Sequence, residues 1–260
     1  LIVHKIESSG GIIYAKSNTP EFEAGANTFN EVFGKTVNPW SVKLSAGGSS
    51  GGAAAAVASG MAFIAQGSDF ACSVRYPASF CGIVGIRPTP GLIPQGPNKM
   101  PYQSLSVIGP LARNIEDLGL ALDGMFGYSK YDPMTNPFSS GGYRKAAKIQ
   151  IKPKTIAFSE DLDITPVSKQ VRETFLKAIN IIANNGVNAV KTHPDFKSSQ
   201  DAFYTLRAFQ FSTMWGDVLK KHSKKLKPEV AWNIKKGFDK KSDELASAEN
   251  SRLEVRNNLL

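Results

Sequence analysis

A chain of 260 residues and 28.0 kDa is long enough to bury a sizeable hydrophobic core. Its composition, 42% hydrophobic and 20% charged with two cysteines, excludes a disordered chain and a disulfide framework, so we expect a cytoplasmic protein. The net charge of +9 leaves an anionic partner open, whereas the lack of an apolar run of ~18 residues predicts no membrane-spanning segment.

The N-terminal part of the chain predicts a helix followed by a strand. The sequence starts without a methionine, inside a predicted helix over residues 1–7, and we therefore expect an internal fragment of a longer protein. Apolar runs predict strands over residues 11–15 and 81–86.

Two helices of the first half are marked by their start signals. Gly47–Gly52 is a glycine-rich loop that opens directly into residues 53–58, which are rich in alanine, the residue type with the highest helix propensity. Asn114 predicts the N-cap of a second helix, which Gly124 or Gly127 ends.

The second half alternates strands with longer helices. Residues 128–148 are rich in Pro, Gly and Ser and predict a connection. Thr165 and Pro166 predict the cap and first position of an amphipathic helix that ends at Asn185. The other predicted elements are strands over 155–158 and 187–190 and helices over 201–225 and 243–259. Strands that alternate with helices predict an α/β layered fold.

The excess positive charge lies entirely in the second half. Residues 1–140 carry 9 Lys and Arg against 9 Asp and Glu, whereas residues 141–260 carry 22 against 13. We therefore predict a core region over 1–140 and a basic, helix-rich remainder of the same domain over 141–260. The lysines of the second region lack the interleaved aromatic residues of a single-strand binder, so we expect a solvated helix surface rather than a nucleic-acid partner.

Several catalytic machineries have no support in the sequence. The three histidines, His4, His193 and His222, are interpreted as surface or packing residues. No C-x-x-C or H-E-x-x-H occurs, so no metal site is expected. The glycine loop lacks the G-K-[ST] ending of a phosphate loop, and we expect no nucleotide or other cofactor.

Serine is the remaining candidate nucleophile. Ser49 and Ser50 lie in the glycine loop at a predicted helix start, where backbone N–H groups point outward and the helix dipole favours negative charge. Ser73 follows a run of small residues, which can leave N–H groups free beside its hydroxyl, as in an oxyanion hole. From the residues alone, a purely structural glycine loop stays open as the alternative.

The two serine segments together resemble the signature of the amidase signature family. That signature begins with Gly-Gly-Ser-Ser-Gly-Gly, here Gly47–Gly52, and continues with a helix of small residues, here 53–60. A second motif, Gly-x-Asp-x-small-x-Ser-aliphatic-Arg-x-Pro-small, follows at the family's spacing as residues 67–78. The similarity extends over residues 15–22, 33–34, 38–40, 79–85, 87–89 and 109–113.

The resemblance implies a fold and a chemistry. The fold would be an amidase-signature α/β fold, with a mixed central sheet covered by helices on both faces (α/β/α), incomplete here. The chemistry would be hydrolysis of a carboxamide by a Ser–Ser–Lys triad, with no cofactor. Ser73 would be the nucleophile, and Ser49 would be the bridging serine, held by a cis peptide bond after Gly48.

The resemblance also assigns the residues around the two serines. The oxyanion would be bound by the backbone N–H groups of Phe70, Ala71, Cys72 and Ser73. The loops would be supported by the hydrogen bonds of Ser50, Asp69 and Arg75. Glu23 falls at a position where the family lines its substrate pocket.

Two features depart from the family pattern. The family's catalytic lysine lies on a Pro-Val-x-Val-Lys-Asp strand well upstream of the glycine loop, and none of Lys5, Lys16 and Lys43 matches it. We therefore assign no catalytic lysine and expect the 260-residue chain itself to be inactive. Members usually carry Gly-Gly before the nucleophile, where this chain has Ala71 and Cys72. A side chain there costs ~1–2 kcal/mol if φ is positive.

Three functions are compatible with this sequence. The first is a stand-alone amidase acting on a small-molecule amide, whose substrate stays open, as does a homodimer. The second is the glutaminase (A) subunit of a tRNA-dependent amidotransferase, which usually has glutamine at Tyr76 and a different segment at 102–109. The third is a non-catalytic binding protein on an amidase scaffold, whose partner would be sought on the basic half.

Overall fold

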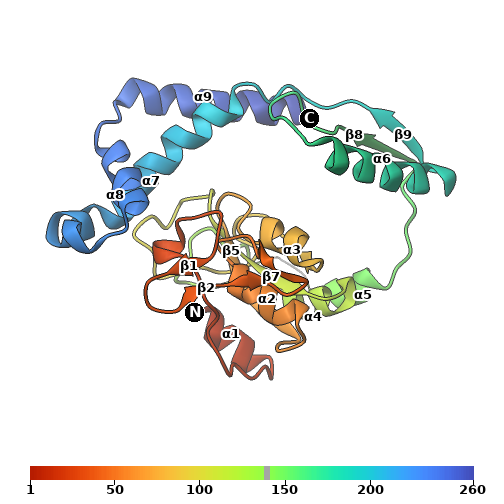
Figure 1. The fold of residues 1–260 in the computed structure, drawn as a ribbon, viewed down its shortest axis with the longest axis horizontal. Helices are drawn as coiled ribbons and strands as arrows, with labels where there is room; N and C mark the ends of the chain where they lie inside the picture. Colours follow the sequence, from red (N-terminus) through yellow and green to blue (C-terminus); the bar gives the residue numbers. More distant parts are fainter. Residues whose placement is uncertain (138–140) are drawn as a thin grey trace. The chain divides into compact units, whose positions relative to one another are not determined.

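The computed structural model describes residues 1–137 and 141–260 and divides into two compact units (Figure 1). Unit 1 comprises Leu1–Ile149 with Lys227–Val230, and unit 2 comprises Gln150–Leu226 with Ala231–Leu260. The boundary predicted between residues 140 and 141 borders on 138–140, which lie outside the described residues, and stays a prediction.

Unit 1 combines short helices with small sheets. Its helices are α1 (Ile2–Ser8), η1 (Glu21–Glu23), α2 (Gly51–Ala58), α3 (Arg75–Cys81), α4 (Ile115–Met125) and α5 (Tyr143–Ala147). Its strands are β1 (Phe29–Asn30), β2 (Gly34–Lys35), β3 (Val37–Asn38), β4 (Ser41–Ser45), β5 (Ile64–Asp69), β6 (Val84–Gly85) and β7 (Val107–Ala112). β1 pairs with β2 and β3 pairs with β4, both antiparallel.

The core of unit 1 is built on the antiparallel sheet β5-β7-β6. Successive side chains of a strand point to opposite faces, and the two faces meet different helices. Ala65 lies opposite Leu111, and both contact the cluster that contains the alanines of α2. Ile64 and Ile108 contact the cluster formed by α4. Helices therefore cover both faces of this sheet, which confirms the predicted α/β/α layering.

The helices on this sheet begin where the sequence predicts. α2 starts at Gly51, directly after the glycine loop. The side chain of Asn114 accepts a hydrogen bond of 2.8 Å from the N–H of Asp117, so the predicted N-cap of α4 is confirmed. α4 ends at Met125, between the two glycines predicted to end it.

Unit 2 contains a parallel strand pair and long helices. Its elements are β8 (Thr155–Phe158), α6 (Lys169–Asn184), β9 (Asn188–Lys191), α7 (Ser199–His222), η2 (Ser223–Lys225), α8 (Pro228–Phe238) and α9 (Ser242–Leu259), of which α8 begins in the short segment assigned to unit 1. β8 and β9 are parallel, with Ile156 opposite Ala189, and α6 connects them. α7 packs along α9. The predicted strands and the two long helices are present, with ends displaced by one to three residues.

Two predicted strands are corrected by the structure. Residues 11–15 form no strand, since strand formation requires pairing with a neighbour and none is present for them in the described part of the chain. Of residues 81–86, only Val84–Gly85 is a strand, because Cys81 ends α3 and Gly82, with φ of +66°, terminates that helix in the left-handed region.

Three helical predictions are also corrected. The helix predicted from Thr165 begins at Lys169, because Ser168 is its N-cap and accepts a hydrogen bond from the N–H of Val171. α8, with Pro228 at its first position, is not among the predicted elements. The predicted connection over 128–148 contains the short helix α5.

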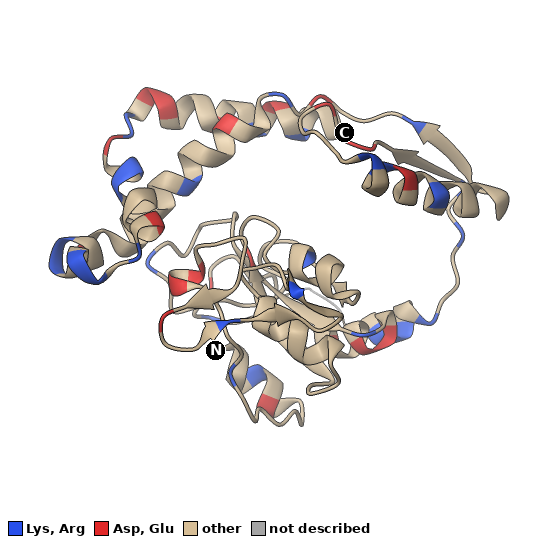
Figure 2. Ribbon diagram, in the orientation of Figure 1, with Lys and Arg blue, Asp and Glu red and all other residues tan. Residues whose placement is uncertain are grey.

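Charge is distributed along the chain as the sequence shows. Lys and Arg are frequent around the end of α7 and along α8, where Lys220, Lys221, Lys224 and Lys225 follow one another (Figure 2). Within the described ranges, no helix combines the length and the apolar character needed to cross a lipid bilayer.

Candidate active site

The first serine loop connects β4 to α2 and is buried. Gly47 has a φ of +75°, and the peptide bond between Gly48 and Ser49 is cis, as the family resemblance implied. Ser49 is 1% exposed and Ser50 is 4% exposed. The chain leaves this loop directly into α2, so both serines stand at the N-terminal end of a helix.

The second serine, Ser73, lies in the turn between β5 and α3 and is 9% exposed. The carbonyl oxygen of Ser73 accepts a hydrogen bond of 3.1 Å from the N–H of Ser50. The two segments, 24 positions apart in sequence, are therefore joined through their backbones. The structure brings the predicted nucleophile next to the predicted bridging loop.

Asp69 organises the turn that carries Ser73. This carboxylate is fully buried, and it accepts hydrogen bonds from the N–H groups of Cys72 (3.0 Å), Val74 (3.3 Å) and Arg75 (3.4 Å). The Arg75 side chain donates Nε to Oδ2 and Nη2 to Oδ1, both at 3.0 Å. Arg87 adds a second ion pair at 3.3 Å.

These contacts determine the charge state of the turn. Burial by itself raises the pKa of Asp69, but the hydrogen bonds and charge of Arg75, with the N–H of Val74, lower it to below its ordinary value of 3.8. The hydrogen bond to Asp69 in turn raises the pKa of Arg75. The site therefore contains a buried, ionised carboxylate whose two oxygens both face donors.

The residues before Ser73 form the predicted oxyanion loop. Phe70 is half-buried, whereas Ala71 and Cys72 are exposed. Cys72 has a φ of +67°, in the left-handed region that favours glycine, and its N–H is engaged by Asp69. In the part of the chain that the structure describes, the N–H groups of Ala71 and Ser73 donate no hydrogen bond.

Ser50 and Glu23 meet at Ser68 on β5. The N–H of Ser68 donates to Oγ of Ser50 at 3.3 Å, and Oγ of Ser68 donates to the carboxylate of Glu23. Glu23 is exposed and has a φ of +58°. The structure thus places Glu23 one residue away from the serine loop, and its role in a substrate pocket stays a prediction.

No base for Ser49 is found in the described residues. Among residues 1–137 and 141–260, no lysine is hydrogen bonded to the hydroxyl of Ser49 or of Ser73. The same residues contain no cluster of three or more His, Cys, Asp or Glu side chains suited to a metal ion.

Comparison with known proteins decides the family. The family model described as Amidase matches residues 1–259. The chain is 35% identical over 205 residues to an acylamidase of Rhodococcus erythropolis, which covers 79% of this chain and 43% of the relative. The chain belongs to the amidase signature family. It is also 33% identical to one subunit of the glutamyl-tRNA(Gln) amidotransferase of Gloeobacter violaceus, over 81% of this chain and 43% of that relative.

Solved structures of the amidase signature family share this fold. A bacterial aryl acylamidase of the family superimposes with a TM-score of 0.88 at 23% identity, over 99% of this chain and 55% of the other. A 6-aminohexanoate cyclic dimer hydrolase gives a TM-score of 0.85 at 24% identity, over 99% and 56%. The chain therefore spans about half the length of the proteins it matches.

Two residues of this amidase-signature site have no predicted role. Arg87 lies within the segment of family similarity at 87–89, but nothing in the sequence marks it as the second partner of Asp69. Thr28 is 2% exposed and contacts the serine loop through its hydroxyl. Its partners are backbone groups about twenty positions away, and no motif at Thr28 indicates them.

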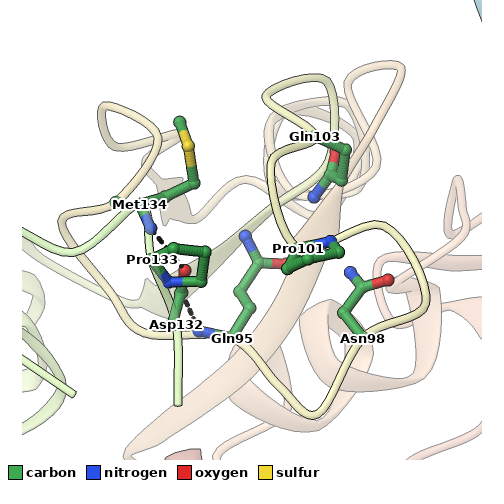
Figure 3. A pocket seen from close by; sticks show the side chains of 8 residues that line it. Gln95, Asn98, Pro101, Gln103, Asp132, Pro133 and Met134 are labelled. Carbon is green, nitrogen blue, oxygen red and sulfur yellow. Dashed lines mark hydrogen bonds between the residues drawn. The ribbon is translucent and has the colours of Figure 1, made fainter. Parts of the chain in front are cut away.

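A second concave region of the chain has no connection with the serines. Residues 91–103 and 132–134 surround a small pocket with room for about one water (Figure 3). Its central carboxylate, Asp132, accepts hydrogen bonds from the N–H groups of Gln95 (2.7 Å) and Met134 (3.0 Å). Asp132 therefore ties two loops together, and none of the predicted site residues lines this pocket.

Proposed function

We propose that the intact natural protein is an amidase that hydrolyses a carboxamide C–N bond through an acyl-enzyme on Ser73. The observation that supports this most is that the family match over residues 1–259 contains both signature serines in buried loops joined by a backbone hydrogen bond. The acylamidase relative agrees with this reaction class. The substrate would be a small-molecule amide.

The proposed reaction uses the two serines in sequence. Oγ of Ser73 attacks the amide carbon, and its proton passes through Ser49 to a lysine base. The tetrahedral intermediate collapses when the leaving amine takes a proton back through Ser49, and the C–N bond breaks. Water then attacks the acyl carbon and releases the carboxylic acid, while Ser73 regains its proton.

The turn from Asp69 to Arg75 would supply the oxyanion site. Its predicted donors are the backbone N–H groups of residues 70–73, of which that of Cys72 is already engaged by Asp69. The N–H groups of Ala71 and Ser73 are the best placed, because both lie beside the hydroxyl of Ser73 and donate to nothing else in the described residues. Asp69 and Arg75 would hold this turn in shape before substrate arrives.

The lysine base has no matching residue in these 260 positions. A serine hydroxyl is a poor nucleophile without a base, and removal of a general base costs about 10²–10⁴-fold in rate. We therefore propose that a protein consisting of residues 1–260 alone would be inactive. The activity assay requires the intact natural protein.

Labelling by a serine-directed fluorophosphonate tests the nucleophile. In the intact natural protein, Ser73→Ala should abolish labelling, whereas Ser59→Ala, a matched change at the exposed end of α2, should leave it as in the wild type. Cys72→Ala should still be labelled, which would show that the neighbouring thiol does not take up the probe. Labelling that persists in Ser73→Ala would contradict the assignment.

A second candidate is the glutaminase subunit of a tRNA-dependent amidotransferase, because several relatives at 32–41% identity are named as glutamyl-tRNA(Gln) amidotransferases. Release of ammonia and glutamate from glutamine by the intact protein would favour it. Tyr76, where that subunit usually has glutamine, favours the stand-alone amidase. An intact wild type that neither takes up the probe nor releases ammonia from any amide would instead indicate a binding protein.

A further inference from the structure

A buried threonine lies against the serine loop. Thr28 immediately precedes β1 and is 2% exposed, and its backbone carbonyl accepts a hydrogen bond of 3.0 Å from the N–H of Thr36. The backbone of Thr28 is thus held by the β1–β2 hairpin, while its side chain points at residues 47–51.

The hydroxyl of Thr28 bridges three backbone groups of that loop. Oγ1 lies 3.0 Å from the carbonyl oxygen of Gly47 and 3.1 Å from that of Ser49, and it accepts a hydrogen bond of 3.0 Å from the N–H of Gly51. A hydroxyl has one proton and two lone pairs, so it can donate to only one carbonyl at a time while accepting from the N–H. These contacts lie on both sides of Ser49.

The loop is shaped to admit this hydroxyl. A Cβ on Gly51 would lie 2.4 Å from Oγ1 of Thr28, so only glycine allows the close approach at this position. On the other side, the N–H of Gly47 donates to Oγ of Ser45 at 3.0 Å. The backbone on either side of Ser49 is therefore anchored by side-chain hydroxyls from outside the loop.

We propose that Thr28 is a positioning residue for Ser49. Its hydroxyl fixes the loop in the conformation in which the Ser49 side chain can relay a proton, which rests on the proposed amidase function. A buried hydroxyl with three partners determines a single loop geometry, and small displacements of a relay group can cost up to about 10²-fold in rate. This role assigns Thr28 no contact with substrate.

The test compares Thr28→Val with a matched control in the intact natural protein. The control is Thr135→Val, since Thr135 is 7% exposed and its hydroxyl also contacts one N–H, of Ser129 at 3.1 Å, and two carbonyls, of Ser129 at 3.1 Å and Asp132 at 2.8 Å. The probe is a fluorophosphonate, and the readouts are its maximal inactivation rate and its half-saturating concentration. Thr28→Val should lower the maximal rate about 10–100-fold and change the half-saturating concentration less than about threefold.

The conservative variant separates the hydroxyl from its methyl group. Thr28→Ser keeps the three hydrogen bonds and should restore the maximal rate to within about threefold of the wild type. If Thr28→Val does not fold, Thr28→Ala takes its place, since it leaves a space beside the three polar groups instead of an apolar methyl. A Thr28→Ser as slow as Thr28→Val would overturn the proposal, because packing alone would then explain the effect.

The remaining outcomes distinguish the two proposals. If Ser73→Ala is unlabelled and Thr28→Val matches Thr135→Val, the amidase stands and the role of Thr28 is wrong. If Ser73→Ala is labelled, the amidase proposal fails. Hydrogen exchange of the Gly51 amide then tests Thr28 by itself: Thr28→Val should speed this exchange more than Thr135→Val does, and equal exchange would overturn the proposal.

Discussion

The N–H of Ser50 donates a hydrogen bond of 3.1 Å to the carbonyl oxygen of Ser73, and this contact joins the two serine segments of the chain. One segment follows β4 and the other follows β5, so each is positioned by a different strand. Because the link runs through backbone atoms, it does not depend on the two side chains that the amidase proposal uses for chemistry. Those hydroxyls stay available, and the supporting residues around them can be tested separately.

Asp69→Asn should destabilise unit 1. Each oxygen of Asp69 accepts hydrogen bonds from N–H donors, so an amide NH₂ group would face donors in either orientation. Arg87 would also lose its charged partner. We expect a loss of about 2–3 kcal/mol in the free energy of unfolding, measured by urea denaturation at pH 7. Asp239→Asn, at an exposed carboxylate with no ion pair among the described residues, is the control and should change the free energy by less than about 0.5 kcal/mol.

The same carboxylate makes stability depend on acid pH. Because its folded pKa lies below the ordinary value of 3.8, Asp69 stabilises the folded state above pH 3.8, and this contribution is lost as pH falls through the lower, folded pKa. The free energy of unfolding of the wild type should therefore fall below pH 3.8 more steeply than that of Asp69→Asn. The difference between the two curves isolates Asp69 from Glu116 and Asp123, whose pKa values are also lowered. Parallel curves would contradict the assignment.

Asn114→Ala should weaken α4. The side chain of Asn114 accepts a hydrogen bond from the N–H of Asp117, and its loss leaves a helix N–H group unpaired. We expect a loss of about 1 kcal/mol in the free energy of unfolding, because α4 packs on the sheet that carries Asp69. Asn114→Ser keeps a cap and should recover most of the loss. Thermal unfolding of the three proteins checks this, and equal midpoints for Ala and Ser would show that the cap contributes nothing.

The sequence predicts best the features that local chemistry determines. The glycine loop, the start of α2 and the cap of α4 each depend on residues within a few positions of one another, and all are found. The family resemblance adds the cis bond after Gly48, which no composition or spacing in this chain would indicate.

The features that sequence reasoning misses depend on distant parts of the chain. Residues 11–15 have a strand-like composition, but pairing requires a partner that the fold does not place beside them. Arg87 and Thr28 reach their partners across 18 to 23 positions, and both bind groups that a sequence pattern does not mark. At Ser168, a cap hydrogen bond three residues inside the predicted start determines where α6 begins.

Cys72→Gly should stabilise the protein, and the backbone gives the reason. Cys72 has a φ of +67°, where an L side chain costs about 1–2 kcal/mol, and its side chain is exposed, so little packing is lost with it. Glycine loses more backbone entropy on folding, so the net gain expected in the free energy of unfolding is about 0.5–1 kcal/mol. Ala71→Gly is the matched control, because Ala71 is also exposed but does not have a positive φ. It should be neutral or destabilising. Urea denaturation of both variants decides, and an equal gain in the two would show that the strain at Cys72 is not the cause.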